Sequence, residues 1–256
     1  MRIGLDFHVV DGAPQGSRSH LLGIYEEVIP NHSEKEFYIF IKNDEFLKSY
    51  SPIFRLSNVK VIKVKKYPSI IRLILQLPLL CLKYRINILH CQYNLPPILH
   101  CKSVVTIHDV LFESHPKYFN LFQRLRLKIL VRMASKTSSH IATVSNFSKN
   151  EIATRYGVTR DKISVIYNAV DKTRFFPGTE GLDVIKRKNL ESKNYLLSVG
   201  RVEPRKNYLG LISAYSKSKN FSIPLVIIGT KDFGYSRNDA VIFKIGELKK
   251  LEEIIN

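Results

Sequence analysis

A ten-residue stretch, residues 198–207, restricts the fold of this chain more than any other part of the sequence. It reads Ser-Val-Gly-Arg-Val-Glu-Pro-Arg-Lys-Asn and continues the apolar run 195–199, which is typical of a short buried strand. Residues 208–215, which follow it, have apolar side chains at helical spacing. The sequence therefore predicts a strand, a tight loop and the first turn of a helix, in that order.

The predicted loop has the composition of an anion site. Gly200 lets the backbone turn sharply after the strand, and Pro204 lies where it costs no strand or helix hydrogen bond. Arg201, Arg205 and Lys206 gather at the helix N-terminus, where unpaired N–H groups already favour an anion. These cations repel one another unless a negative group lies between them, which favours a bound phosphate or diphosphate. The alternative is that all three are solvated residues beside an ordinary turn.

The same alternation of apolar runs and helical patterns continues along the chain. The predicted strands are 2–10, 37–41, 59–64, 87–91, 103–107, 141–145, 162–167, 195–199, 224–229 and 240–246. The predicted helices are 19–28, 44–50, 70–84, 118–136, 149–156, 208–215 and 247–255. This pattern predicts an α/β protein with Rossmann-like domains at 1–172 and 194–256, joined by a polar linker at 173–193.

Composition indicates a globular protein with an anionic partner. The chain has 256 residues, of which 45% are hydrophobic, enough for one large core or two modest ones. Its net charge is +18, and residues 1–170 hold 24 Lys and Arg against 12 Asp and Glu. The partner could be nucleic acid, a phosphorylated substrate or an acidic membrane surface. No nucleic-acid-binding motif accompanies the charge, so we expect no nucleic acid.

Cysteine usage predicts a reducing, cytoplasmic environment. The chain has three cysteines and no Cys-x-x-Cys pair. The pairs His90-Cys91 and His100-Cys101 do not have the spacing of a usual structural metal site, so we expect no metal. The chain opens directly into a predicted strand, so we also expect no signal peptide.

The most apolar stretch, 70–82, is too short and too interrupted by Arg72 and Pro78 to span a bilayer. Two interpretations of the predicted helix 70–84 stay open. It could pack on the sheet, or it could rest on anionic lipid, since its broad apolar face has a basic edge. That edge consists of Lys65, Lys66, Arg72, Lys83 and Arg85.

Two further places on the chain could contact a ligand. His108 and Asp109 follow the predicted strand 103–107, and the carboxyl ends of parallel strands form the rim where open α/β sheets bind ligands. Such a histidine could donate to a phosphate or sugar hydroxyl or relay a proton, although the pair could also simply cap the next segment. The loop 11–18 could cradle a ligand, but its Gly12 and Gly16 do not complete a dinucleotide fingerprint.

Several motifs resemble those of the retaining, nucleotide-sugar-dependent glycosyltransferases of group 1, family 4. The loop Gly-Arg-x-Glu-Pro-Arg-Lys-Asn at 200–207 closely resembles the family's donor-phosphate loop. The other matching motifs are Thr-Ile-His-Asp at 106–109, His-Pro-x-Tyr-Phe at 115–119, Val-Ser-x-Phe-Ser at 144–148 and Asn-Ala-Val-Asp at 168–171.

The resemblance implies the GT-B architecture, in which two Rossmann-like domains face each other across a cleft, and the second domain would be incomplete here. It implies that Arg201 and Lys206, with Gly200, hold the donor diphosphate and neutralise it as it leaves. His108 and Asp109 would be the catalytic residues that line the sugar site. The remaining implied positions are Gly16, Ser17 and Arg18 in the loop on the acceptor side and Ser145 and Asn168 elsewhere in the cleft.

The implied reaction transfers a hexose, for example mannose, from a nucleoside-diphosphate sugar to a hydroxyl acceptor with retention of configuration. It needs neither metal nor other cofactor, and its setting would be bacterial surface polysaccharide synthesis. The basic first domain suits a lipid-linked saccharide acceptor and a peripheral location on the inner face of the plasma membrane.

The family's Glu-x7-Glu pair is missing from its expected context. Its only match by spacing, Glu26 with Glu34, straddles Pro30 in the first domain. We therefore expect either that a second chain completes the second domain or that the sequence is a truncated product. The competing hypothesis is a non-catalytic relative that binds nucleotide or an anionic surface, or one half of a split enzyme. A nucleic-acid-binding protein is a weaker third hypothesis, supported by charge alone.

Overall fold

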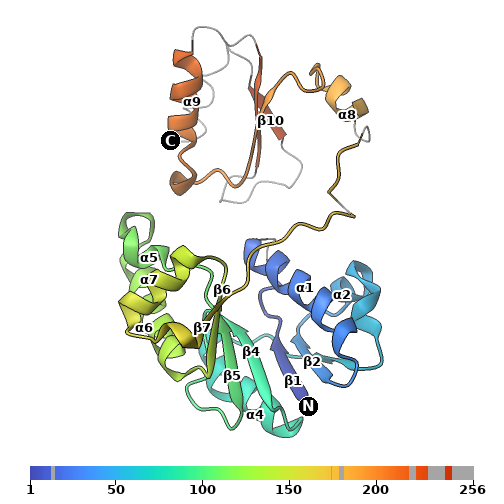
Figure 1. Ribbon diagram of the computed structural model, residues 1–256, viewed down its shortest axis with the longest axis vertical. Coiled ribbons are helices and arrows are strands. Elements are labelled where there is room, and N and C mark those ends of the chain that lie inside the picture. The colour runs from blue at the N-terminus through green and yellow to red at the C-terminus, as the bar shows by residue number, and fades with distance from the viewer. Residues whose placement is uncertain (13–14, 174, 179–181, 219–222, 230–239, 244–256) are drawn as a thin grey trace. The chain divides into compact units, whose positions relative to one another are not determined.

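The structure is a computed structural model, and the chain forms two compact units (Figure 1). It describes residues 1–12, 15–173, 175–178, 182–218, 223–229 and 240–243. The first unit runs from Met1 to Asp171 and the second from Lys172 to Asn256. We describe each unit by itself.

Unit 1 is built on a seven-stranded sheet with the order β3-β2-β1-β4-β5-β6-β7. Every pair of neighbouring strands is parallel, as predicted. The chain runs outward from β1 to β3 and then crosses back to β4 on the other side of β1, so the strand order reverses between β1 and β4. Open α/β sheets bind ligands at the carboxyl ends beside such a reversal. The strands are β1 (Arg2–Asp6), β2 (Glu36–Ile41), β3 (Val59–Lys63), β4 (Ile88–Gln92), β5 (Lys102–Thr106), β6 (His140–Thr143) and β7 (Ile163–Val165).

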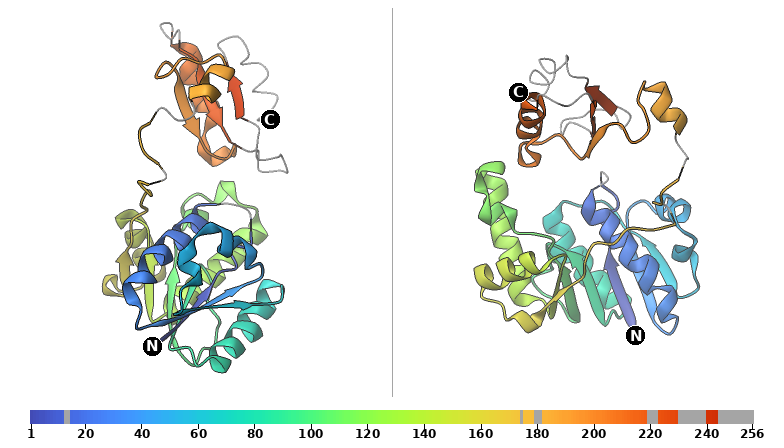
Figure 2. Two further views of the ribbon diagram at one scale, coloured as in Figure 1. Left: turned by 90° about the vertical axis from the view of Figure 1, so that its right-hand side faces the viewer. Right: turned by 45° about the horizontal axis from the view of Figure 1, so that its top comes forward.

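Helices cover both faces of this sheet (Figures 1 and 2). One face packs against α1 (Gly16–Val28) and α2 (Glu45–Tyr50). The other face packs against α3 (Ser69–Ile71), the π-helical turn η3 (Arg72–Gln76), α4 (Leu77–Lys83), α5 (Leu111–Ser114), α6 (Leu121–Thr137) and α7 (Asn146–Tyr156). Single 3-10 turns complete the unit at η1 (Pro30–His32), η2 (Pro52–Arg55), η4 (Pro116–Tyr118) and η5 (Arg160–Lys162).

Strand β2 shows why the sheet needs two helical layers. Its side chains alternate between the two faces, as strand geometry requires. Phe37, Ile39 and Ile41 belong to the hydrophobic core under α1 and α2, whereas Tyr38 and Phe40 belong to the core on the opposite face. All five are buried, so β2 reads as a continuous apolar run, typical of a parallel strand covered on both sides.

The predicted helix 70–84 is observed as a continuous helical segment at 69–83, which contains the π turn η3. Pro78 lies next to this turn and has no N–H to donate, and its ring would crowd the carbonyl of Ile74 in a regular α-helix. A wider turn just before the proline relieves that clash. The sheet-facing residues Leu73, Leu77 and Cys81 are buried in the core.

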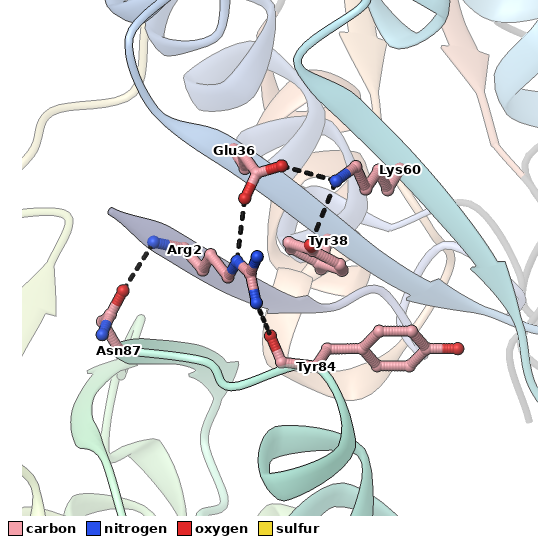
Figure 3. Close-up of polar contacts among 6 residues, drawn as sticks. All are labelled: Arg2, Glu36, Tyr38, Lys60, Tyr84 and Asn87. Carbon is pink, nitrogen blue, oxygen red and sulfur yellow. Dashed lines mark hydrogen bonds and ion pairs between the residues drawn. The ribbon is translucent and has the colours of Figure 1, made fainter.

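A network of polar contacts holds the amino end of the sheet together (Figure 3). The Arg2 side chain donates to Glu36 at 2.8 Å and to the carbonyl of Tyr84 at 3.2 Å. Glu36 also accepts a hydrogen bond from Lys60 at 2.5 Å, and Lys60 contacts the Tyr38 hydroxyl at 3.2 Å. The network joins β1, β2 and β3 to the turn before β4, at the opposite end of the strands from the predicted rim.

A buried polar bridge crosses the centre of unit 1. The Tyr25 hydroxyl lies 2.7 Å from Nδ1 of His90, and Nε2 of His90 lies 2.8 Å from the Thr106 hydroxyl. In a neutral imidazole one nitrogen donates and the other accepts, so the two hydroxyls satisfy both. Burial, helped by the nearby charge of His20, lowers the pKa of His90 to about 4. This bridge ties α1 to β4 and β5 and requires a neutral His90.

Unit 2 has a three-stranded sheet in the order β10-β9-β8. Strands β8 and β9 are parallel, and β10 runs antiparallel to β9. The predicted strand 240–246 is observed over its first four residues, while residues 244–246 and the predicted helix 247–255 lie outside the described residues. The predicted linker 173–193 contains a short helix, α8. The elements are α8 (Leu182–Arg187), β8 (Leu196–Val199), the 3-10 turn η6 (Pro204–Lys206), α9 (Tyr208–Lys217), β9 (Leu225–Ile228) and β10 (Ala240–Phe243).

The ends of β8 and β9 approach each other at two glycines. The N–H of Gly200 donates to the carbonyl of Ile228 at 2.9 Å. A Cβ atom added to Gly229 would overlap the carbonyl of Gly200, which also accepts a hydrogen bond from the Tyr208 hydroxyl at 3.1 Å. Gly229 therefore permits a backbone contact that fixes the start of the loop 200–207.

We expect Gly229→Ala to destabilise unit 2 by about 1–3 kcal/mol, because the new methyl group must push two strand ends apart. The matched control is Gly23→Ala in α1, where an added Cβ meets no atom within 4 Å. That change should stabilise unit 1 by about 0.5–1 kcal/mol. Hydrogen exchange of the amides in β8 and β9 measures the first effect, and unchanged protection there would contradict it.

Protonation of His90 should weaken the fold at mildly acidic pH. The lowered pKa means that, between about pH 6.5 and 4, the unfolded chain binds a proton that the folded chain resists, so the free energy of unfolding falls as pH falls. His90→Gln should reduce this fall, whereas His100→Gln, at an exposed position, should leave it unchanged. Urea unfolding at a series of pH values between 7 and 4.5 measures the slope, and equal slopes for the parent and His90→Gln would refute the assignment.

Candidate functional site

Polar rings gather around His108 at the carboxyl end of β5. The ring nitrogen Nε2 of His108 donates to the side-chain oxygen of Gln92, the last residue of β4, at 2.6 Å. The ring of His20 meets the His108 ring edge to face, with centroids 4.9 Å apart, and the Tyr93 ring lies 5.6 Å away. The structure thus brings residues of α1, β4 and the end of β5 together beside the reversal of strand order.

The environment of His108 fixes its protonation. Burial, together with the neighbouring His20, lowers the pKa of His108 to about 4. His108 is therefore neutral at physiological pH. Because its Nε2 donates to Gln92, its Nδ1 carries the lone pair and can accept a hydrogen bond from a hydroxyl group. Burial also lowers the pKa of His20, against a raising effect of the Ile166 carbonyl.

Asp109 is exposed, unlike the partly buried His108 that precedes it. Its carboxylate is exposed and accepts a hydrogen bond from the N–H of Leu111, the first residue of α5, at 3.0 Å. From the sequence, one alternative is that the His108-Asp109 pair simply caps the next segment. The contact of Asp109 with Leu111 agrees with that alternative. Among the contacts of the described residues, none joins the Asp109 carboxylate to the His108 ring.

Ser145 belongs to the same rim through α7. Its side chain accepts a hydrogen bond from the N–H of Ser148 at 3.1 Å and so caps the N-terminus of α7. The Ser148 hydroxyl in turn donates to the carbonyl of His108 at 2.9 Å. This chain of contacts fastens the start of α7 to the backbone that holds His108. Asn168 lies in the exposed segment after β7, and no contact described for that segment joins it to His108.

The predicted glycine loop leads into α1. Gly16 is the first residue of that helix, and Ser17 is partly exposed in its first turn. Arg18 turns back on the loop, since its guanidinium donates to the carbonyl of Gly12 at 3.2 Å. The same group stacks on Phe46 of α2, with its Cζ 3.9 Å from the ring centre. Arg18 therefore packs on the α2 side of the loop, and His20, two residues further along α1, contacts the His108 ring.

A pocket of about 250 Å³ opens at the carboxyl ends of β1, β2 and β3. At its base, buried Asp6 lies 3.0 Å from Nδ1 of His8 and forms an ion pair with Arg72 of η3. Burial alone would raise the pKa of Asp6, but His8 and Arg72 outweigh it and lower this pKa to about 2. The buried position of Arg72 corrects its assignment to the exposed basic edge of the helix, because the guanidinium follows its counterion inward.

In unit 2, the loop after β8 has the predicted form. Gly200 follows the strand, Lys206 ends the turn η6, and Asn207 has a left-handed backbone with φ 52° just before α9. The predicted cations are Arg201, Arg205 and Lys206. All three are exposed, and Arg205 pairs with Glu203 at 2.5 Å.

Sequence reasoning missed His20, Gln92 and the Asp6–Arg72 pair. The signal for Asp6 was a carboxylate inside an otherwise apolar run, and the signal for Gln92 was a polar residue just beyond a predicted strand. Nothing in the sequence pointed to His20, which lies in a helix far along the chain from His108. Among the described residues, no group of three or more His, Cys, Asp and Glu could hold a metal ion. Nor does any described helix have the length and apolar character needed to cross a membrane.

The chain is similar to known glycosyltransferases. The model of Glycosyltransferase Family 4 matches residues 28–174. The O-antigen chain mannosyltransferase RfbU of Salmonella typhimurium is 33% identical over 149 residues, which are 57% of this chain and 37% of that protein. An N-acetylgalactosaminyltransferase of Campylobacter jejuni, named for a diphospho-undecaprenol-linked substrate, is 27% identical over 128 residues, 50% of this chain and 33% of that protein. The matches thus span about a third of each relative's length.

The crystal structure of Anabaena Alr3699/HepE in complex with UDP-glucose has the same fold. The structural match covers 100% of this chain and 65% of the Anabaena chain, with a TM-score of 0.63 and 17% sequence identity. The architecture is therefore that of the two-domain GT-B glycosyltransferases. Since the family model covers more than half of the sequence, this chain belongs to Glycosyltransferase Family 4.

Proposed function

We propose that the chain takes part in the transfer of a hexose, such as mannose, from a nucleoside-diphosphate sugar to a hydroxyl of a lipid-linked saccharide. The transfer retains the anomeric configuration and belongs to bacterial surface polysaccharide synthesis. The observation that supports this proposal is the loop at 200–207, which contains the exposed Arg201 and Lys206 and leads into α9. Names of relatives support the sugar and the acceptor, since one is an O-antigen mannosyltransferase and another acts on a diphospho-undecaprenol-linked substrate.

The donor loop suits a diphosphate leaving group. Negative charge grows on the diphosphate as its bond to the sugar breaks, and Arg201 and Lys206 would stabilise that charge without reorganising. The N-terminus of α9 adds the partial positive charge of its backbone amides. Gly200 lets the loop pack closely on α9, because a Cβ atom there would lie only 3.2 Å from the Tyr208 hydroxyl. No metal or cofactor is needed for this electrostatic role.

The rim of unit 1 would hold the sugar. Neutral His108 can accept a hydrogen bond from a sugar hydroxyl through Nδ1 while Gln92 holds its other nitrogen. We assign Asp109 to positioning, since its carboxylate fixes the start of α5 next to His108. Ser145 would position the same segment through Ser148.

The acceptor would lie along the loop that begins α1, where Gly16, Ser17 and Arg18 shape the wall. Arg18 would act through its contact with Gly12, which holds the loop in place. Asn168 would line the opening from the segment after β7.

Titration calorimetry with UDP and GDP tests the donor site. The parent chain should bind one of them saturably, and Arg201→Ala/Lys206→Ala should weaken binding at least tenfold, because two charge-assisted contacts are lost. The matched control, Arg187→Ala/Lys188→Ala, removes the same charge from exposed positions on and beside α8 and should bind like the parent. The proposal fails if neither nucleotide binds, or if the two double variants bind equally well.

We also propose that the outer side of the segment 69–83 rests on an anionic membrane. The inner side of this segment packs on the sheet, but Ile70, Ile74, Leu75, Leu79 and Leu82 are all more than half exposed. Lys65, Lys66, Lys83 and Arg85 flank them and are exposed as well. We call these apolar residues the exposed stripe. An apolar stripe between cations is the arrangement that interfacial binding requires.

Cosedimentation with vesicles of phosphatidylglycerol tests the membrane contact. Leu79→Glu should reduce the bound fraction severalfold, because it places a negative charge in the middle of the stripe. Val184→Glu, at a residue of α8 that is 51% exposed, is the control and should sediment like the parent. Binding to neutral phosphatidylcholine as strong as to phosphatidylglycerol would contradict the role of the basic residues.

A further inference from the structure

The pocket at the carboxyl ends of β1, β2 and β3 lies apart from the contacts of His108. Its lining includes the buried Asp6–Arg72 pair and the side chains of Lys42, Lys65 and Lys66. We propose that this pocket binds the diphosphate group of an isoprenoid-linked acceptor, while the exposed stripe contacts the isoprenoid chain. This assignment rests on the proposed transfer to a lipid-linked saccharide and names the residues that would hold its anionic part.

Charge is the first argument for an anionic ligand. The negative charge of Asp6 is already balanced by Arg72 at the base of the pocket. Asp11 is engaged too, since its two carboxylate oxygens accept the backbone N–H groups of Lys42 and Asn43, each at 2.9 Å. Within the part of the chain that the structure describes, the ammonium groups of the three lysines form no ion pair. Three lysines against Asp11 leave an excess of positive charge, which a diphosphate would neutralise.

The base of the pocket is rigid enough to serve a ligand. Asp6 is the last residue of β1. Its carboxylate contacts His8, two residues further along the chain, and Arg72 of η3. Breaking a buried ion pair costs several kcal/mol, so the pair holds η3 against β1. The π turn places Arg72 and Gln76 on the pocket side, and π turns within helices are frequent at functional sites.

The apolar surroundings define the rest of the ligand. Phe40, Leu77 and Leu80 line the same pocket beside the charged groups. On the outer side of the same segment, Leu75 and Leu79 are 55% and 61% exposed. A ligand that uses both surfaces must join an anionic group to a long apolar chain, as an isoprenoid diphosphate does. A free nucleotide sugar would leave the apolar surface without a partner.

The same phosphate chemistry could come from the headgroup of an anionic membrane lipid. The two sources differ in what the pocket must recognise, because an isoprenoid diphosphate carries adjacent phosphates and needs no bilayer. Binding of a soluble isoprenoid diphosphate in the absence of membrane therefore separates them.

Titration calorimetry of the full chain with farnesyl diphosphate tests the proposal, with pyrophosphate and farnesol as the two partial ligands. Farnesyl diphosphate should bind more tightly than either partial ligand, because only it engages both surfaces. Lys65→Gln/Lys66→Gln should weaken its binding at least tenfold, and Lys42→Gln should weaken it in the same direction. The control Lys102→Gln/Lys188→Gln changes the same charge at two exposed positions outside the pocket and should bind like the parent. Unfolding midpoints confirm that each variant is folded.

Three outcomes would overturn the assignment. The first is equal binding of farnesyl diphosphate by the pocket variants and the control. The second is loss of that binding in Arg201→Ala/Lys206→Ala, which would place the diphosphate in the donor loop. The third is that Lys65→Gln/Lys66→Gln lowers binding to phosphatidylglycerol vesicles but not to farnesyl diphosphate, which would assign the pocket to lipid headgroups. Binding of farnesyl diphosphate that needs Lys65 and Lys66, in a chain that binds neither UDP nor GDP, would retain the pocket and reject the donor site instead.

Discussion

The reversal of strand order between β1 and β4 determines where unit 1 can bind anything. Parallel pairing directs all seven strands the same way, so their carboxyl ends meet at one edge. The polar residues that follow these strands gather there, because the two helical layers bury most of the central strands in apolar cores. His108 with its partners and the Asp6 pocket both lie at this edge. The amino edge instead carries the network around Arg2 and Glu36, which joins β1, β2 and β3.

Desolvation sets the chemistry of this edge as much as the choice of residues does. His90 and His108 lie near enough to the core that burial lowers the pKa of each to about 4, so both remain neutral at physiological pH. Neutral His90 can link Tyr25 and Thr106, and neutral His108 can accept from a hydroxyl. Asp6 is buried more deeply still but keeps its charge, because Arg72 and His8 compensate it. The edge thus combines uncharged hydrogen-bonding groups with a pocket rich in lysines, which suits a polar sugar next to an anionic group.

Under the proposed function, the two units would bind different parts of the substrates. Unit 2 presents exposed cations at a helix N-terminus, where a diphosphate would be stabilised most as it leaves. Under the proposed function, the uncharged rim of unit 1 would hold the sugar, and its basic, partly apolar surface would hold a membrane-bound acceptor. The close contact of Gly200 and Gly229 explains why a glycine follows both β8 and β9 at the start of the loop 200–207. In each unit the polar residues of the candidate site lie at the ends of strands and helices, so the sheets determine their positions.

The sequence by itself determined the order of the elements, the parallel sheet of unit 1 and the family, because apolar periodicity and short motifs are local properties of the chain. The predicted strands and helices agree with the structure within a few residues wherever it describes them. Tertiary structure alone decided which residues meet. Arg72 looked like part of a basic edge, but its counterion Asp6 lies 66 residues away and draws it inward. His20 reaches His108, and Tyr25 reaches His90, only because α1 packs against the sheet of unit 1. Such pairings, and the pKa shifts that follow from burial, depend on contacts between distant segments, and no local pattern encodes them.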